Sequence, residues 1–347
     1  MKVSIGTNIK EGPWGGGNLF AINLSNFLKN RGHEVVYDLS HNDIDIILIT
    51  EPRKTSESSS FTHIDVENYL KYEKFDTIVI HRINECDERK NTNYVNKYLI
   101  YANKIADETI FVSKWLKNLY LNQGLKSRKN HVVYGGANSE IFNRDGFKPW
   151  KNNQKIKIVT HHWGANWNKG FDTYLKIDAL MNSDEWKNKI EFTYVGNMPK
   201  KANFSNSNLI KPISGKKLAT ELKKHHLYVT GSLNEPSGNH HIESAQCGLP
   251  ILYISSGGIP EYCEGYGIKF TTDNIESKLE EMILNYDYYV EAVKQYPNDS
   301  NKMSEEFLKI FENALNNKDT HLKKRNLQIN KSKFNKFFYF LKKNFFN

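Results

Sequence analysis

Short apolar runs alternate with amphipathic stretches along this chain, and the alternation predicts an α/β protein. Residues 20, 24, 27 and 28 are apolar and fall on one helical face, which predicts a helix after the first strand. The stretch Arg-Gly-His-Glu-Val-Val-Tyr then leads into a second strand. A strand, a helix and a strand in this order favour parallel pairing. The strands expected from the other apolar runs cover residues 2–7, 43–49, 77–87, 156–160, 191–197, 227–230 and 250–254.

Length and composition support two packed domains. The chain has 347 residues, enough for two domains of ordinary size, and 39% of them are hydrophobic, which excludes a disordered chain. A polar stretch that begins at Lys148 separates the two α/β halves, so we expect one domain at residues 1–148 and another at residues 149–297. The three cysteines are widely spaced and form no CxxC pair, which indicates reduced thiols rather than disulfides or a metal site.

Positive charge is concentrated at the carboxyl end. Residues 316–347 contain nine lysines and arginines and one aspartate, and therefore carry +8 of the net charge of +9. Within residues 331–347 the apolar side chains fall on one helical face, a pattern that suits an anionic membrane surface. A helix docked on the protein and a disordered tail remain open alternatives. The nearly neutral remainder of the chain argues against a nucleic-acid partner.

Localisation follows from what the chain lacks. We find no secretory signal and no run of roughly 20 apolar residues that could span a membrane. We therefore expect a cytoplasmic protein, with the tail able to hold it at the inner face of the membrane.

The most informative stretch runs from Glu235 to Glu243, with seven residues between the two carboxylates. A helix is expected to begin within it, at Ser237, Gly238 and Asn239, where unpaired backbone N–H groups and the positive dipole end favour a phosphate. Glu243 would face the same end and could bind the two hydroxyls of a ribose, while Glu235 would lie nearer to whatever follows the phosphates. Solvated charges that flank a helix are the simpler alternative.

At these two glutamates and the Gly-Leu-Pro strand that follows them, the sequence resembles the retaining family four of nucleotide-sugar-dependent glycosyltransferases. The resemblance implies the GT-B architecture, in which two Rossmann-like, doubly wound parallel-sheet domains face a central cleft. It also implies transfer of a sugar from a nucleotide-sugar donor to an acceptor hydroxyl with retention, without a metal or other cofactor. On the same basis residues 298–315 would return as a helix to the amino-terminal domain, ahead of a basic aromatic tail at 316–347. A glycan or lipid-linked acceptor in surface polysaccharide or glycoconjugate synthesis is expected.

The resemblance further implies roles for individual residues. Catalytic roles are expected for Glu235, Lys169 and His81. Donor-binding roles are expected for the first loop and for residues near the two glutamates, namely Gly15, Gly16, Gly17, His162, Gly238, Asn239, His240, Glu243, Gly257 and Gly258. A buried structural histidine remains open for His81, and a plain surface loop for the first glycines.

The chain departs from this family ahead of Lys169. The family has an arginine five or six residues before its Lys-Gly pair, whereas this chain has Gly164 and Trp163 there. A lysine supplies one point charge, and a protonated His161 or His162 could supply a second. Zinc is not expected at the adjacent histidine pairs, because neighbouring side chains diverge and no Cys/His ligand spacing is present.

Two other functions remain open. A nucleotide-sugar epimerase or hydrolase of the same architecture would turn over its sugar without an acceptor. A non-catalytic nucleotide-sugar or glycan-binding module would bind a donor and transfer nothing, and the missing arginine keeps this alternative in view.

Overall fold

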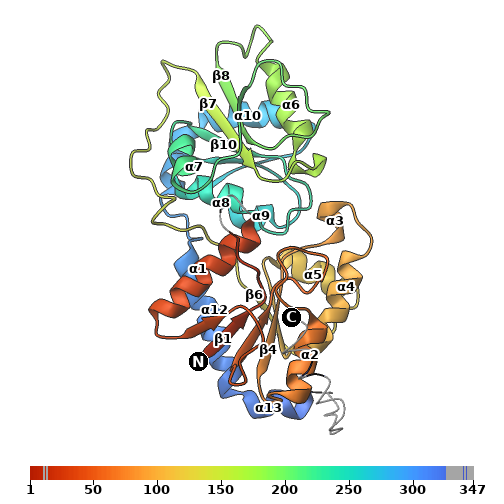
Figure 1. The fold of residues 1–347 in the computed structure, drawn as a ribbon. Helices are drawn as coiled ribbons and strands as arrows, with labels where there is room; N and C mark the ends of the chain where they lie inside the picture. Colours follow the sequence, from red (N-terminus) through yellow and green to blue (C-terminus); the bar gives the residue numbers. More distant parts are fainter. Residues whose placement is uncertain (11, 13–14, 326–338, 340, 342–347) are drawn as a thin grey trace.

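The computed structural model describes residues 1–10, 12, 15–325, 339 and 341, which form two α/β domains placed end to end (Figure 1). The amino-terminal domain is built on a six-stranded sheet in the order β2-β1-β3-β4-β5-β6, with its strands paired in parallel. These strands are β1 (Lys2–Ile5), β2 (Glu34–Val36), β3 (Ile46–Ile49), β4 (Ile78–Ile83), β5 (Glu108–Phe111) and β6 (Asn130–Val132). The strand order reverses at β1, which places a ligand crevice at the carboxyl ends of the strands.

The carboxy-terminal domain repeats this plan. Its parallel sheet has the order β12-β11-β10-β7-β8-β9. The strands are β7 (Ile156–His162), β8 (Ile190–Gly196), β9 (Asn208–Ile210), β10 (Leu227–Thr230), β11 (Ile251–Ile254) and β12 (Gly267–Phe270). The order reverses at β7, so the two histidines at the end of that strand lie at the second crevice.

Helices cover both sheets. In the amino-terminal half they are α1 (Gly16–Asn30), α2 (His63–Tyr72), α3 (Asp87–Lys90), α4 (Val95–Ala102) and α5 (Lys114–Asn122), with the 3-10 helix η1 (Asn103–Ile105). In the second half they are η2 (Trp167–Lys169), α6 (Phe171–Leu180), α7 (Gly215–Leu222), α8 (Asn239–Gln246), α9 (Ile259–Cys263), α10 (Ile275–Leu284) and α11 (Tyr286–Val293), followed by α12 (Ser300–Asn316) and α13 (Lys318–Lys324).

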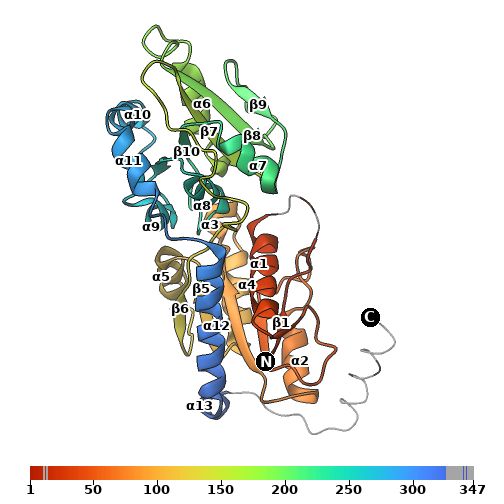
Figure 2. The same ribbon diagram turned by 90° about the vertical axis from the view of Figure 1, so that its left-hand side faces the viewer.

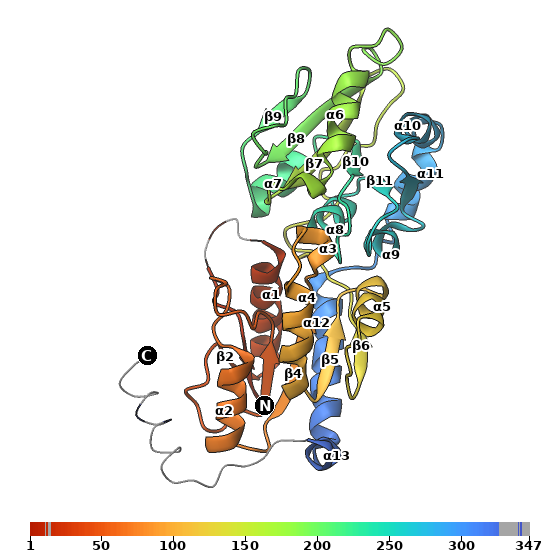
Figure 3. The ribbon, with the colours of Figure 1, turned by 90° about the vertical axis from the view of Figure 1, so that its right-hand side faces the viewer.

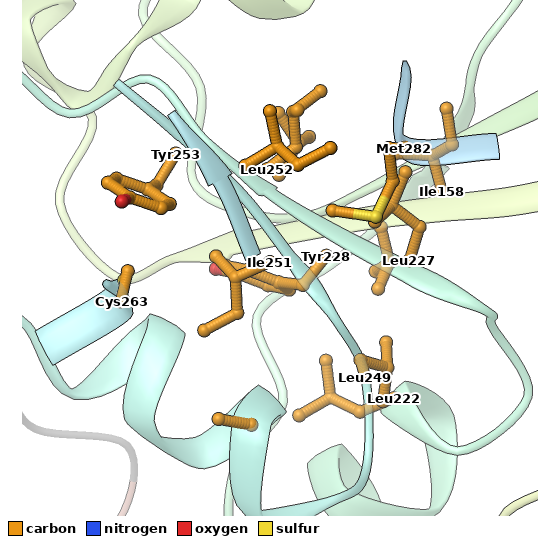
Figure 4. Close-up of a cluster of buried hydrophobic side chains, with 14 of the residues drawn as sticks. Ile158, Leu222, Leu227, Tyr228, Leu249, Ile251, Leu252, Tyr253, Cys263 and Met282 are labelled. Atoms are coloured by element: carbon orange, nitrogen blue, oxygen red, sulfur yellow. The ribbon is translucent and has the colours of Figure 1, made fainter. Parts of the chain in front are cut away.

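Apolar packing against the sheets accounts for both cores. Around β10 and β11, buried side chains such as Leu227, Ile251 and Leu252 pack with Ile158 of β7 and Met282 of α10 (Figure 4). These strands are buried on both faces, which explains why they read as continuous apolar runs rather than alternating ones.

The chain crosses back to the first domain before α12. The backbone N–H of Ser300 donates to the carbonyl oxygen of Ala137 at 2.8 Å, and α12 then runs alongside α1 (Figure 2). The Phe20 and Phe307 rings, one from each helix, lie 5.0 Å apart. The segment expected to return near residues 298–315 therefore packs on the amino-terminal sheet, and the boundary expected at residue 148 falls between β6 and β7.

Helix α1 begins at Gly16, so Gly16 and Gly17, which were expected in the first loop, are the first residues of a helix. In the part of the chain that the structure describes, no helix is both long and apolar enough to cross a membrane. The aromatic stripe expected within residues 331–347 lies largely outside the described residues.

Candidate functional site

A cavity of about 830 Å³ lies between the two domains. Its amino-terminal wall comes from the start of α1 and the end of β4, and its carboxy-terminal wall comes from the end of β7, from η2 and from the start of α8. Figure 3 shows α1 and α3 directed toward α7 and α8 across this space. Both sheets therefore point their carboxyl ends toward one site.

The start of α8 is the central feature of the carboxy-terminal wall. Gly238 precedes the helix with φ +97°, and a Cβ there would lie 2.7 Å from the ring of His240, so glycine is required. Across the cavity, a Cβ on Gly16 would lie 3.0 Å from Oδ1 of Asn239, which shows how closely the two helix starts approach. Two positive dipole ends and their free N–H groups thus meet in one place, an arrangement that favours an anion.

Glu235 lies in a buried cluster of charges beside α8. Its Oε2 accepts a hydrogen bond from Nζ of Lys169 at 2.6 Å and one from Nε of Arg89 at 3.2 Å. Burial alone would raise the pKa of Glu235, but the charges of Arg89 and Lys169 hold it well below its usual range. Glu235 is therefore an ionised carboxylate that holds Lys169 at the cavity.

Gly257 and Gly258 act on the loop rather than at the cavity surface. The N–H of Gly258 donates to the carbonyl oxygen of Glu235 at 2.8 Å. A Cβ on Gly257 would lie 2.5 Å from the same oxygen. Neither glycine lines the cavity, so their part is to let two loops pack closely and fix the position of Glu235.

Glu243 is paired with a histidine from β7. Nε2 of His161 lies 2.9 Å from Oε2 of Glu243, and both side chains line the cavity. Nδ1 of His161 is buried and has no hydrogen-bond partner among the described residues. The second glutamate of the motif is thus held at the cavity wall by a strand-end histidine.

His162 and His240 form a neutral pair at the same wall. Their rings lie 4.6 Å apart, and their Nε2 atoms contact the Tyr174 hydroxyl at 2.6 Å and the Thr230 hydroxyl at 2.9 Å. Burial lowers the pKa of each histidine well below its usual value. Burial therefore opposes protonation of His162 in the absence of a ligand, and its part in replacing the missing arginine stays a prediction.

His81 does not reach the cavity. It is fully buried in β4, and its Nδ1 lies 2.9 Å from Oδ1 of Asn103. Burial lowers its pKa to about 4. The side chain of the next residue, Arg82, lines the cavity instead, because successive side chains of a strand point to opposite faces. The structural alternative for His81 is the one observed, and the strand alternation contained the signal.

Sequence reasoning also missed Glu85 and Arg89. Arg89 pairs with Glu85, four residues before it, at 2.9 Å and reaches across the cavity to Glu235 at 3.1 Å. The spacing of four residues was visible in the sequence, but the contact with Glu235 joins residues 146 positions apart. Among the described residues, no group of three His, Cys, Asp or Glu side chains is placed to hold a metal.

Two Rossmann-like domains that face a polar cleft through their strand ends define the GT-B architecture, and the predicted fold is confirmed. A glycosyltransferase from Rickettsia africae aligns over 91% of this chain and 98% of its own, with 14% identity and a TM-score of 0.66. HepE of Anabaena, in complex with UDP-glucose, aligns over 90% of this chain and 100% of its own, with 10% identity and a TM-score of 0.64. These similarities establish the fold.

A sequence relative extends this comparison. The chain is 22% identical over 205 residues to the gpi3 subunit of phosphatidylinositol N-acetylglucosaminyltransferase from Schizosaccharomyces pombe. The match covers 55% of this chain and 44% of that subunit, so the chain spans less than half the length of this relative. No protein-family model matches the chain.

Proposed function

We propose that this protein is a glycosyltransferase that moves a sugar from a nucleotide-sugar donor to an acceptor hydroxyl. The observation that carries the proposal is the meeting of the α8 start, the α1 start and Lys169 in one cavity between two Rossmann-like domains. The similar structures named above point the same way, since one is of a glycosyltransferase and another holds UDP-glucose.

The proposed chemistry places the donor diphosphate at the amide groups of residues 238–240. Negative charge builds up on this diphosphate as the sugar leaves, and preorganised N–H groups and a nearby ammonium group stabilise it without reorganisation. Lys169 supplies the ammonium group, and Glu235 fixes it in position. Glu243, which pairs with His161, accepts hydrogen bonds from the hydroxyl groups of the nucleotide ribose in this scheme.

Retention of the anomeric configuration belongs to the same proposal. Glu235 is ionised and held by two cations, and the His162–His240 pair is neutral and bound to hydroxyl groups. The departing phosphate then accepts the proton of the incoming hydroxyl, which attacks the sugar on the face from which the phosphate leaves. No step of this scheme uses a metal.

Calorimetric titration with UDP-, GDP- and ADP-sugars tests the donor, followed by an assay of nucleoside diphosphate release with glycan and lipid-linked acceptors. We expect one nucleotide class to bind, and Glu243→Gln to weaken its binding about 10-fold through the lost charge-assisted hydrogen bonds. Glu280→Gln removes an exposed carboxylate of α10 in the same domain and should bind like the wild type.

The outcomes separate the alternatives. Binding with neither release nor transfer would favour a non-catalytic nucleotide-sugar module. Conversion of the sugar in the absence of an acceptor would favour an epimerase or hydrolase. Failure of all three nucleotide classes to bind would overturn the proposal.

We also propose that the basic tail brings the enzyme to an anionic membrane face, where a lipid-linked acceptor would lie. Arg325, which directly follows α13, is buried, and its guanidinium group donates a hydrogen bond to Oδ1 of Asp107 at 3.3 Å. A truncated variant should therefore keep α13 and Arg325. A chain that ends after Arg325 should lose pelleting with anionic liposomes that the full chain shows. Equal pelleting of both chains would contradict the proposal.

A further inference from the structure

Six lysines and arginines line the cavity, and five of them are ion-paired. In the amino-terminal wall, Lys10 pairs with Glu57, Arg53 pairs with Glu51, and Lys90 pairs with Glu85. Arg89 of the same wall pairs with both Glu85 and Glu235. Lys169 of the carboxy-terminal wall also pairs with Glu235. These carboxylates cancel much of the positive charge that a ligand would otherwise meet.

Arg82 is the exception within the described residues. Arg82 lies at the end of β4 and is only 7% exposed. Its guanidinium carbon lies 3.8 Å from the centre of the Phe20 ring. Among the residues that the structure describes, no carboxylate pairs with the guanidinium and no hydrogen bond engages it. Burial lowers its pKa to about 10, so it remains charged at neutral pH.

A buried and unpaired charge is costly to a folded protein. Stacking on Phe20 satisfies one face of the guanidinium plane but none of its N–H donors. Because Arg82 lines the cavity, an anion in the cavity can accept hydrogen bonds from these N–H donors. The stacked plane also holds the guanidinium in one orientation.

The surroundings of Arg82 narrow the kind of anion. Phe20 lies one helical turn after Gly16, and Gly16 approaches Asn239 at the start of α8. Tyr262 interacts electrostatically with Arg82, and its hydroxyl group accepts a hydrogen bond from the N–H of Gly135 at 3.0 Å. Arg82 thus lies beside the place where the two helix starts converge, and this place favours a phosphate.

We propose that Arg82 binds a phosphate group of the substrate. This inference rests on the proposed function, and it deepens that function by giving the amino-terminal domain a direct part in holding the phosphates. A stacked guanidinium can donate two parallel hydrogen bonds to phosphate oxygens, which an ammonium group cannot do. Lys169 then acts from the carboxy-terminal domain and Arg82 from the amino-terminal domain, so a bound phosphate draws the two walls together.

Arg82→Met tests this directly, because methionine keeps an unbranched apolar side chain against Phe20 and removes the charge. Arg31→Met is the matched control: Arg31 also stacks on a phenylalanine of α1, with its guanidinium carbon 4.9 Å from the Phe27 ring, but it lies outside the cavity. Melting temperatures measured without ligand show that each variant is folded. Titrations then use UDP, GDP and ADP with their nucleosides.

We expect Arg82→Met to weaken the nucleoside diphosphate that the wild type binds by about 10- to 100-fold and to leave the nucleoside unchanged. Arg82→Lys should recover part of the loss, and Arg31→Met should bind like the wild type. This result supports the proposal with the donor as the source of the phosphate.

A second arm tests a phosphate carried by the acceptor. Inorganic phosphate and glycerol 3-phosphate are added to protein saturated with the nucleoside diphosphate. If they raise the melting temperature of the wild type but not of Arg82→Met, while the diphosphate binds both equally, the proposal stands with the acceptor as the source. If neither arm depends on Arg82, the proposal is overturned while the proposed function survives. If the wild type binds no nucleoside diphosphate, both fail.

Discussion

The two walls of the cleft differ in how tightly their glycines are packed. In the carboxy-terminal wall, a methyl group on Gly238 would lie 2.7 Å from its nearest neighbour atom, and one on Gly257, in the loop behind this wall, would lie 2.5 Å from the carbonyl oxygen of Glu235. In the amino-terminal wall, a methyl group on Gly15 or Gly17 would meet no atom of the described chain within 4 Å. The first wall is therefore filled by its own atoms, and the second leaves open space around Gly15 and Gly17 at a helix start.

One charged group from each wall shows the same difference. Lys169 of the carboxy-terminal wall is held by Glu235 at 2.6 Å, whereas Arg82 of the amino-terminal wall stacks on a ring and has no carboxylate partner among the described residues. We infer that the carboxy-terminal wall is formed before a ligand arrives, and that the amino-terminal wall is completed by the ligand.

The largest effect is expected from Lys169→Met. It removes the ammonium group that faces the leaving phosphate, so the rate of nucleoside diphosphate release should fall about 100- to 1,000-fold. Lys176→Met removes an exposed lysine from α6 of the same domain and should keep the wild-type rate. Initial rates at saturating donor measure both variants, and a loss below 10-fold would show that the carboxy-terminal wall does not stabilise the leaving group.

The packing of the carboxy-terminal wall is tested by Gly238→Ala against Gly146→Ala. Both glycines have positive φ, +97° and +82°, but only Gly238 is crowded. We expect Gly146→Ala to cost about 1 kcal/mol of unfolding free energy from backbone strain alone, and Gly238→Ala about 3 kcal/mol because the clash is added. Urea denaturation measures both. Equal costs would mean that the α8 start can relax, contrary to a preformed wall.

A pH experiment tests the buried histidine beside Arg82. His81 has a pKa of about 4 in the folded protein, below the value of about 6.5 in an unfolded chain, so the unfolded chain binds more protons between these values. Stability from this group is present above pH 6.5 and is lost as the pH falls toward 4. Between pH 7 and 4.5 the wild type should lose about 2 kcal/mol more than His81→Gln.

Identical pH profiles of the wild type and His81→Gln would contradict the buried, neutral state of His81. His226, with a pKa lowered to about 4 by burial in the other domain, is unchanged in both proteins. Its contribution therefore cancels in the comparison.

The smallest effect is expected from Gly17→Ala. Gly17 lies in the first turn of α1 with open space around it, so alanine should raise the unfolding free energy by about 0.5 kcal/mol through helix propensity. A loss of stability, measured by the same urea titration, would mean that the amino-terminal wall is as closely packed as its partner.

The sequence predicted the parts of this molecule that depend on local pattern. Buried runs such as Leu227–Thr230 became strands, and the helix expected within the Glu235–Glu243 stretch is present as α8. A run of glycines favours a turn, although α1 begins at Gly16 and packs against α12. Local pattern carries no information about that tertiary contact.

The amino-terminal wall was harder to predict for the same reason. His81 was expected at the site from the family resemblance, and only the facing of the strand separates it from the adjacent Arg82. Arg89 meets Glu235 across the domain interface, a contact between segments far apart in the sequence. The key residues of the carboxy-terminal wall lie close together in the sequence, from Glu235 to Glu243. The residues of the amino-terminal wall come from separate segments that folding brings together.

A crystal structure of the protein with the nucleoside diphosphate that it binds would show whether both walls hold the phosphates. We expect the diphosphate at the N–H groups of residues 238–240, between Lys169 and Arg82, with the ribose hydroxyls at Glu243. A nucleotide bound outside the cleft, with Glu243 still paired to His161 alone, would contradict it.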